Sequence, residues 1–481
     1  SRTPPPTLLE TREIQTLLFG GLKHHPHAVL LAVSAPADAA SAKALLAAVK
    51  PLVGFGDQPD PKCVAMLALG AGALAKAGLS AEGLASFPFA FRDGMASAVR
   101  SKILSDTGDD KPAHWLWGAG DADAVLVIYG ATPAVLKAVE AEATSVLTRH
   151  GGRVVHRVAL RDLDSAAQAS GRGLKNQAHE AFGFADGVSQ PLIKGARRWK
   201  ATRDRIHEVE PGEFILGYPD NRGNLPPGPS LNAVHDPQNL LPIRCDGDAG
   251  FAENVVDAPR EIGRNGSFLV IRQLEQDVAG FSKYCEREAK LVAARFGEPY
   301  HVTAEFIGAK LIGRWKDGSS LVRNPYLPAS DGRSMQKPTA RALTASASPV
   351  LPAAAVRSGG ISLPAPGRPG IATAQSRTSY AVADNDFLYG VEDPEGVRCP
   401  FGAHIRRANP RDSLEPGSQD QIDISNRHRI LRVGRGFDAA RGRNPGLMFM
   451  CLNGDLERQF EFVQQTWLGS ETFHGLSGER D

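Results

Sequence analysis

Cysteine is scarce in this chain and shows no pairing pattern. Five cysteines are spread over 481 residues, at Cys63, Cys245, Cys285, Cys399 and Cys451. Their odd number and the lack of any CxxC or CxxCH pair argue against a disulfide framework, a cysteine zinc site and covalently attached c-type haem. We therefore expect a protein of a reducing compartment, the cytoplasm.

Long apolar runs and an excess of charge are also missing. No stretch of roughly 18 apolar residues predicts a membrane span, and residues 1–6 (SRTPPP) contain no apolar signal region, although a leader removed before Ser1 would leave no trace. Lysine and arginine number 55 against 53 acidic residues, which gives a formal net charge of +2. This balance favours small-molecule ligands over nucleic acid or a membrane surface.

The apolar runs that are present predict an α+β fold. Short strands are expected at 28–33, 63–69, 123–129 and 152–158, with Ala-rich helical patterns after the first three. A Gly/Pro/Asn-rich connection (217–230) precedes a second set: a strand at 267–274, a helix at 275–296, a strand at 446–452 and a helix at 455–467. We therefore expect two domains, residues 1–230 and 231–481, the second with a low-complexity surface insertion at about 325–378.

The segment 398–411, RCPFGAHIRRANPR, sets one histidine, His404, among several arginines. A neutral imidazole can bind iron axially, and guanidinium groups pair bidentately with carboxylates such as haem propionates. A single histidine among 13 is more often structural, so residue chemistry alone leaves haem ligation as one interpretation among several.

Two further segments, GFADG at 183–187 and RHRILRVG at 427–434, add a family resemblance. In this order and with these flanks, the three motifs resemble the dye-decolorizing peroxidases, in particular the longer members of that family. The resemblance covers most of the chain. It implies two ferredoxin-like domains, each an antiparallel sheet with peripheral helices, and haem b bound non-covalently between them. The usage of Ala, Gly and Arg suggests a bacterial source.

The resemblance implies a role for each motif. His404 matches the axial ligand of the haem iron, Asp186 the residue that moves a proton of hydrogen peroxide, and Arg432 the fixed positive charge beside it. Leu447 and Phe449 match a Leu-x-Phe pair that lines the peroxide side of the haem. The implied activity is that of a haem peroxidase, which reduces hydrogen peroxide and oxidises dyes, phenols or other aromatic reductants through an oxoferryl intermediate.

Further positions are candidates for supporting roles. Arg406 and Arg407 could contact the haem propionates, and Asp455 could accept the second N–H of the axial histidine. Large reductants are expected to pass electrons through a surface aromatic residue, for which the candidates are Trp467, Trp315 and Tyr389.

Other functions stay open at this point. A haem-handling protein without peroxidase turnover would need the same histidine. A nicotinamide dehydrogenase would use the GxGxxA pattern formed by Gly70, Gly72 and Ala75 after an apolar strand, but the helix reaches Gly78 too soon for a parallel βαβ crossover. The arginines of 398–443 are interleaved with Ile, Leu and Gly rather than with stacking aromatics, which disfavours nucleic-acid binding. The sequence does not indicate the oligomeric state.

Overall fold

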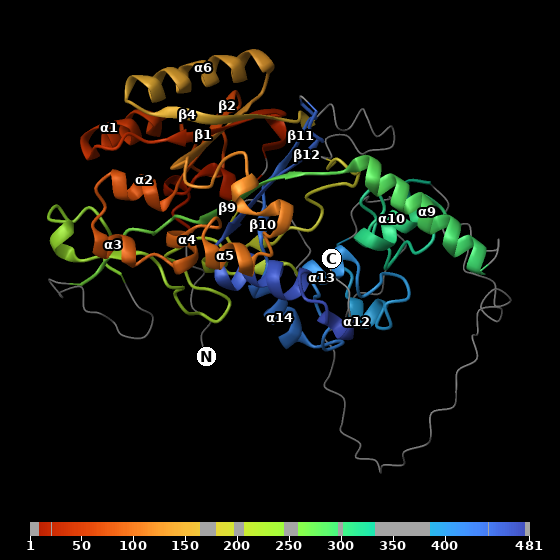
Figure 1. Cartoon of the computed structure of the whole chain (residues 1–481). Coiled ribbons are helices and arrows are strands. Elements are labelled where there is room, and N and C mark those ends of the chain that lie inside the picture. The colour runs from red at the N-terminus through yellow and green to blue at the C-terminus, as the bar shows by residue number, and fades with distance from the viewer. Residues whose placement is uncertain are drawn as a thin grey trace, which may run out of the picture.

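The computed structural model describes residues 9–20, 22–163, 179–196, 206–244, 258–296, 302–331, 385–440 and 442–476. Within these residues the chain forms two larger antiparallel sheets, one above the other, with helices above the first sheet and beside and below the second (Figure 1). The α+β class expected from the sequence is confirmed.

The first sheet has the strand order β2, β3, β1, β4 and is antiparallel throughout. Its strands are β1 (His27–Ser34), β2 (Cys63–Leu69), β3 (Ala124–Gly130) and β4 (Arg153–Leu160). The strands expected from the sequence agree with these bounds closely, because each is a short apolar run bounded by polar or glycine-containing segments.

Both faces of the first sheet are covered. Alternate side chains of a strand point to opposite faces. Val29 and Leu31 therefore pack against helices α1 (Ala39–Val49) and α6 (Pro133–Arg149), whereas Leu30 faces the second sheet. Burial on both faces explains why β1 is an almost unbroken apolar run.

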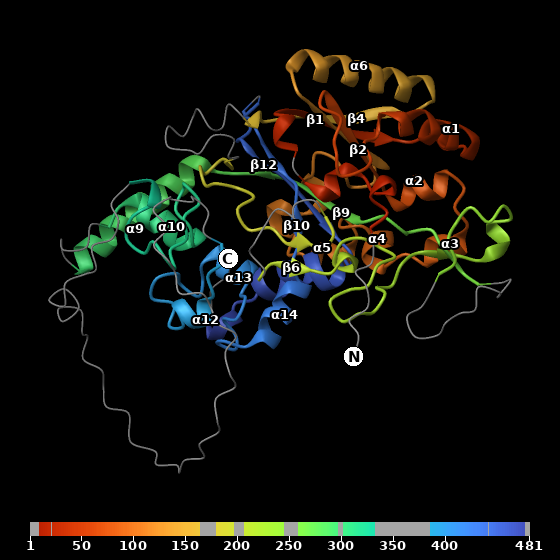
Figure 2. The same ribbon diagram turned by 180° about the vertical axis from the view of Figure 1, so that it is seen from behind.

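The second sheet is centred on β12 (Gly446–Asn453), which pairs antiparallel with β9 (Phe268–Glu275), β10 (Leu431–Arg432) and β11 (Arg435–Phe437). In both views β9 lies below the first sheet, and β12 runs from beside this sheet to below it (Figure 1 and Figure 2). Met448 and Met450 join the core that the two sheets share, so Leu447 and Phe449, which alternate with them, point to the opposite face.

The remaining helices surround the second sheet and the lower edge of the first. Helices α9 and α10 pack on each other at one side of the molecule, and α12, α13 and α14 lie below the sheets (Figure 2). No described helix is long and apolar enough to cross a membrane. The bounds are α2 (Ala71–Lys76), α3 (Ala81–Ala85), α4 (Phe89–Asp93), α5 (Ala98–Ile103), α9 (Val278–Phe296), α10 (Ala304–Ile312), α12 (Tyr389–Glu392), α13 (His404–Ala408), α14 (Gln419–Arg427) and two π-helical segments, η11 (Glu457–Glu461) and η12 (Val463–Leu468). Short paired segments are β5 (Leu192–Ile193) with β6 (Glu208–Val209), and β7 (Ser230–Leu231) with β8 (Arg260–Glu261).

The GxGxxA turn is a packing feature and not a dinucleotide site. β2 pairs antiparallel with β3, and the helix after the turn ends at Lys76, so these elements form no parallel βαβ unit. A Cβ on Gly72 would lie 2.7 Å from Asp123 Oδ1, and Asp123 Oδ2 also holds Lys76 Nζ at 2.7 Å. Small residues are therefore required by the approach of Asp123, which removes the main argument for a dehydrogenase.

The domain division at residue 230 stays a prediction, because the two sheets share one apolar core that contains both Leu30 and Met450. The low-complexity insertion expected at about 325–378 lies, beyond residue 331, outside the described residues.

Candidate active site

A cavity of about 370 Å³ lies between the second sheet, on the face opposite the shared core, and helices α13 and η12. This volume is within the range of roughly 300–1,000 Å³ that is typical of ligand and cofactor pockets. The apolar lining consists of Leu274, Ile405, Ala408, Ile430, Leu447, Phe449, Phe460, Val463 and Leu468. The polar lining consists of Ser189, Arg272, Arg314, Tyr389, His404, Asn409, Arg411, Arg429, Arg432 and Gln464.

His404 is the first residue of α13 and lines the cavity. The loop before it is held by Asp393, whose buried carboxylate accepts hydrogen bonds from Arg398 N at 3.0 Å and Cys399 N at 2.8 Å. The next residue, Ile405, packs so closely on the C-terminus of α10 that a Cβ on Gly313 would lie 2.4 Å from Ile405 Cγ1. These contacts fix the start of α13 and with it the entry of His404 into the cavity.

Leu447 and Phe449 form part of the lining that the second sheet contributes, across the cavity from α13. They alternate along β12 with two methionines of the shared core, so both point into the cavity. Across the sheet Leu447 pairs with Leu274, and Phe449 pairs with Arg272, whose guanidinium is ion-paired to the buried Asp106. The part of this lining that β9 and β12 contribute is therefore apolar apart from Arg272, which already has a carboxylate partner.

Asp186 and Arg432 lie side by side. Arg432 Nη1 is 3.5 Å from Asp186 Oδ1, and Arg432 Nη2 donates to the carbonyl of Ser189 at 3.1 Å. The side chain of Gln190 binds Arg432 on both sides, accepting from its N–H at 3.1 Å and donating to its carbonyl at 2.9 Å. Arg432 lines the main cavity and Asp186 lines a small neighbouring one, so the aspartate approaches the main cavity at the arginine.

Two further cavity arginines, Arg314 and Arg411, meet at Asn385. The Oδ1 atom of Asn385 accepts from Arg314 Nη2 at 2.9 Å and from Arg411 Nη2 at 2.8 Å, and its carbonyl accepts from Arg411 Nη1 at 3.0 Å. Burial, helped by the nearby positive charge of Arg411, lowers the pKa of Arg314 to about 10. Two guanidinium groups held by one neutral side chain form a strongly positive part of the lining, which suits carboxylate ligands.

Arg429 is held by a neutral histidine. Its Nη1 donates to His207 Nδ1 at 2.9 Å, and His207 Nε2 lies 2.7 Å from the carbonyl of Asn385. An arginine can only donate, so Nδ1 accepts and the hydrogen is on Nε2. Burial lowers the pKa of His207 well below its ordinary value, and the charges of Arg429 and Arg411 lower it further.

This buried histidine predicts a pH-dependent stability. The unfolded chain binds a proton on His207 near pH 6.5 and the folded chain does not, so the free energy of unfolding should fall by up to about 1.4 kcal/mol per pH unit below about pH 6.5. His207→Gln keeps hydrogen-bonding groups at this position and cannot titrate. Urea unfolding between about pH 7 and 5 should therefore show a shallower loss of stability for His207→Gln than for the unchanged chain. The exposed His114→Gln is the control and should follow the unchanged chain; equal slopes for both variants would contradict the prediction.

Arg406 and Arg407 do not lie at the cavity. Arg406 is 0% exposed, and its guanidinium donates to Ser413 Oγ, Asp393 Oδ2 and the carbonyls of Cys399 and Asp393. Arg407 is also 0% exposed and donates to backbone carbonyls at the end of η12, including that of Leu468 at 2.9 Å. This placement argues against propionate contacts; both arginines fasten α13 to its surroundings, and the cavity arginines are other residues.

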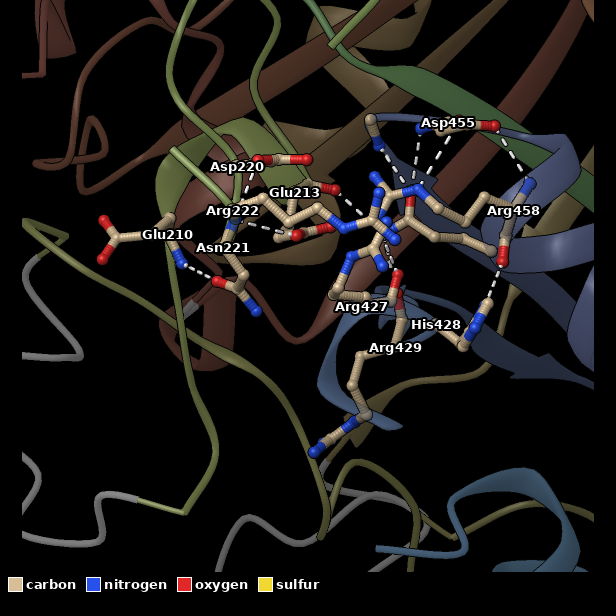
Figure 3. A network of polar contacts seen from close by, with 12 residues as sticks. Glu210, Glu213, Asp220, Asn221, Arg222, Arg427, His428, Arg429, Asp455 and Arg458 are labelled. Carbon is tan, nitrogen blue, oxygen red and sulfur yellow. Dashed lines mark hydrogen bonds and ion pairs between the residues drawn. The ribbon is translucent and has the colours of Figure 1, made fainter. Parts of the chain in front are cut away.

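Asp455 is likewise engaged elsewhere. Its carboxylate accepts a hydrogen bond from Arg458 N at 3.0 Å and lies 3.5 Å from Arg458 Nε (Figure 3). The Nη1 atom of Arg458 lies 2.6 Å from the carboxylate of the fully buried Glu213. In the same view the side chain of Arg429 points away from this network. Asp455 does not line the cavity, so the structure does not bring it together with His404.

The three aromatic candidates for surface electron transfer are all buried, with exposures of 3% for Trp467, 3% for Trp315 and 1% for Tyr389. Tyr389 lines the cavity, and Trp467 packs edge-on against His428, 5.2 Å between ring centroids. None of them is a surface residue, so none can receive electrons by direct contact with a bulky reductant.

The cavity residues fit haem. The apolar lining suits a flat macrocycle, the arginines suit its carboxylates, and His404 supplies an imidazole for axial ligation. Asn409 Oδ1, at the cavity, is buried with no hydrogen-bond partner among the described residues, so it can accept a hydrogen bond from a bound group. Sequence reasoning assigned no role to the cavity residues Arg272, Arg314, Arg411, Arg429 and Asn409. It also assigned none to Asn385 and His207, which hold three of these arginines.

No family model matches the chain, whereas individual curated proteins do. The chain is 24% identical over 457 residues to Peroxidase 2 of Mycetinis scorodonius, which covers 91% of this chain and 69% of that protein. It is 24% identical over 399 residues to dye-decolorizing peroxidase msp1 of the same organism, which covers 78% of this chain and 58% of that protein. It is 26% identical over 325 residues to multifunctional dye peroxidase DyP2 of an Amycolatopsis species, which covers 64% of this chain and 50% of that protein. The chain thus spans only 50% to 69% of the length of these relatives.

Solved structures show the same fold. An ancestral D-type dye-decolorizing peroxidase has a TM-score of 0.66 at 21% identity, over 98% of this chain and 90% of that one. The DyP-type peroxidase of Anabaena has a TM-score of 0.65 at 18% identity, over 97% of this chain and 83% of that one.

The two stacked antiparallel sheets define an α+β protein, with a cavity lined by one histidine and several arginines. In sequence and in fold, the chain is similar to the dye-decolorizing peroxidases. Because relatives occur in Mycetinis and in Amycolatopsis, a bacterial source stays a prediction.

Proposed function

We propose that the protein is a haem peroxidase that reduces hydrogen peroxide and oxidises dyes, phenols or similar aromatic reductants. The observation that carries the proposal is the cavity in which His404, Arg432, Leu447 and Phe449 meet, with Asp186 beside Arg432. Bound non-covalently, haem b would supply the iron that takes oxidising equivalents from peroxide and passes them to the reductant.

His404 would hold the iron from α13. Arg314, Arg411 and Arg429 are the arginines available to the haem carboxylates, since they line the cavity and have five N–H donors each to share. The anchoring by Asn385 holds two of these guanidinium groups in place before a ligand arrives, which reduces the entropy lost on binding.

Asp186 and Arg432 would handle the peroxide. The Asp186 carboxylate accepts a proton from one peroxide oxygen and returns it to the other, while the permanent charge of Arg432 stabilises the negative charge that develops on the leaving oxygen. Leu447 and Phe449 exclude water and bulky molecules from this side, so small peroxides enter and large reductants stay outside.

The proposal is tested by an absorption spectrum of the purified chain, supplied with haem, before and after one equivalent of hydrogen peroxide, followed by a dye-oxidation assay. A Soret band that changes with peroxide, together with dye oxidation, is the expected result. A Soret band that peroxide leaves unchanged would point instead to haem handling, and a protein that takes up no haem would overturn the proposal.

Asn385→Asp should weaken binding of a porphyrin dicarboxylate. The new carboxylate would lie within 2.8 to 2.9 Å of Arg411 and Arg314 and would compete for their donors. We expect affinity for metal-free protoporphyrin IX, which cannot use His404, to fall about tenfold, equivalent to about 1.4 kcal/mol. Affinity for its dimethyl ester should stay the same, which fluorescence titration can measure.

The matched control is Asn239→Asp, because Asn239 Oδ1 also accepts from an arginine, Arg260 Nη2 at 2.6 Å, but neither residue lines the cavity. This variant should bind both porphyrins as the unchanged chain does. If Asn385→Asp lost affinity equally for the dicarboxylate and for the dimethyl ester, the cause would be a general structural defect, and the prediction would be contradicted.

The proposed location is the cytoplasm, supported by the free thiols of the described cysteines, Cys63, Cys285, Cys399 and Cys451.

A further inference from the structure

Glu180 lies at the base of the loop that carries Asp186 and has no role in the mechanism above. Its Oε2 accepts from Phe182 N at 2.8 Å, and its Oε1 accepts from Phe184 N at 2.8 Å. The Glu180 backbone closes the same turn, because its N–H donates to the Phe184 carbonyl at 3.1 Å and its carbonyl accepts from Gly183 N at 2.9 Å. One carboxylate therefore sets the shape of residues 180–184.

The same carboxylate attaches this loop to the second sheet. Gln276 Nε2 donates to Glu180 Oε2 at 2.5 Å, and Gln276 Oε1 accepts from Ala181 N at 3.3 Å. Gln276 directly follows β9, the strand that contributes Arg272 and Leu274 to the cavity. The loop is thus tied to the sheet that lines the cavity.

Asp186 follows the anchored turn with only Ala185 between it and Phe184. Ala185 N donates to the carbonyl of Lys316 at 3.0 Å, which fixes the chain just before the aspartate. The Asp186 carboxylate then meets Arg432 Nη1 at 3.5 Å. A misplacement of about 1 Å in a reacting group can lower a rate about 100-fold, so the anchor of this loop controls a sensitive distance.

We infer that Glu180 is the positioning residue for Asp186: it acts through the backbone of 182–185, and it holds the aspartate where peroxide is met. This inference rests on the proposed peroxidase function. Glu180 does not line the main cavity but shares the small neighbouring cavity with Asp186, so its contribution should appear through Asp186.

The test is a double-mutant cycle read by stopped-flow absorbance, using the haem-loaded full chain and hydrogen peroxide. Glu180→Gln keeps the size of the side chain but turns an amide N–H₂ towards one of the two backbone N–H groups. We expect its second-order rate constant with peroxide to fall at least about tenfold, with haem content and Soret position unchanged. In an Asp186→Asn background the same change should lower the rate less than about twofold, because the step through which Glu180 acts is already lost.

Two further variants sharpen the result. Asp236→Asn is the matched control, since Asp236 also accepts from two backbone N–H groups, Leu240 N at 2.9 Å and Leu241 N at 3.0 Å, in a loop that contributes nothing to the cavity. Gln276→Ala removes the two hydrogen bonds that attach the loop to the second sheet and leaves Glu180 in place. Its rate constant with peroxide should also fall. If Glu180→Gln does not retain haem, Gln276→Ala replaces it in the cycle.

Equal losses in both backgrounds, or no loss in either, would overturn the inference. A protein that binds haem but whose spectrum and dye oxidation do not respond to peroxide would overturn the proposed function instead, so the two failures are distinguishable.

Discussion

Replacing His404 by glycine is expected to remove the bound haem. His404 is the one histidine among the described residues that line the cavity, so the variant leaves only the apolar contacts and the arginines to hold the ligand. Mutation of a residue that merely supports a metal ligand costs about 10- to 100-fold in affinity, and loss of the ligand itself should cost at least that much. The measurement is the ratio of Soret to protein absorbance after expression with excess haem.

Free imidazole provides a specific rescue of this variant. The deleted side chain leaves space for an added imidazole, which should restore the Soret band of His404→Gly if the ligand alone was missing. His114→Gly is the control, because His114 is exposed and does not line the cavity, and it should retain haem. Full haem content in His404→Gly without imidazole would show that another residue binds the iron.

The sequence predicts the sheets well because each core strand carries a local signal. In β12 the same strand serves two environments: Met448 and Met450 enter the core between the sheets, while Leu447 and Phe449 face the cavity. All four side chains are apolar, so the run is evident as a strand, but hydrophobicity alone does not say which face is a cavity. The Leu-x-Phe resemblance supplied that distinction.

The arginines show where sequence reasoning stops. Arg406 and Arg407 follow His404 directly, and yet backbone carbonyls and Asp393 take up their donors. The cavity instead receives Arg314 and Arg411, which are brought together by Asn385 from distant positions in the chain. Nothing local distinguishes a guanidinium that will face a ligand from one that will face a carbonyl, because the choice is made by tertiary packing.

Part of this could have been found from periodicity. Arg272 and Leu274 are two residues apart on β9, and period-2 alternation places them on one face, beside the Phe449 and Leu447 that the resemblance had singled out. Asn385 and His207 offer no such signal, since each acts through partners that are remote in sequence.

Arg432→Met and Asp186→Asn should both leave haem bound and slow its reaction with peroxide. Arg432 supplies a positive charge beside the peroxide, and removing one such stabilising group typically costs about 100- to 1,000-fold in rate. Asp186→Asn keeps the shape of the side chain but cannot accept a proton, and a positioned acid-base group typically contributes about 100- to 10,000-fold. Stopped-flow absorbance at the Soret band gives the rate constants.

The two residues meet at one contact, Arg432 Nη1 to Asp186 Oδ1 at 3.5 Å, so their effects should be less than additive in the double variant. Arg157→Met is the matched control, because Arg157 is an exposed arginine that pairs with Glu140 away from the cavity, and its rate should equal that of the unchanged chain. If the double variant Asp186→Asn with Arg432→Met reacted with peroxide at the native rate, neither residue would handle the peroxide and the acid-base group would have to be sought elsewhere in the cavity.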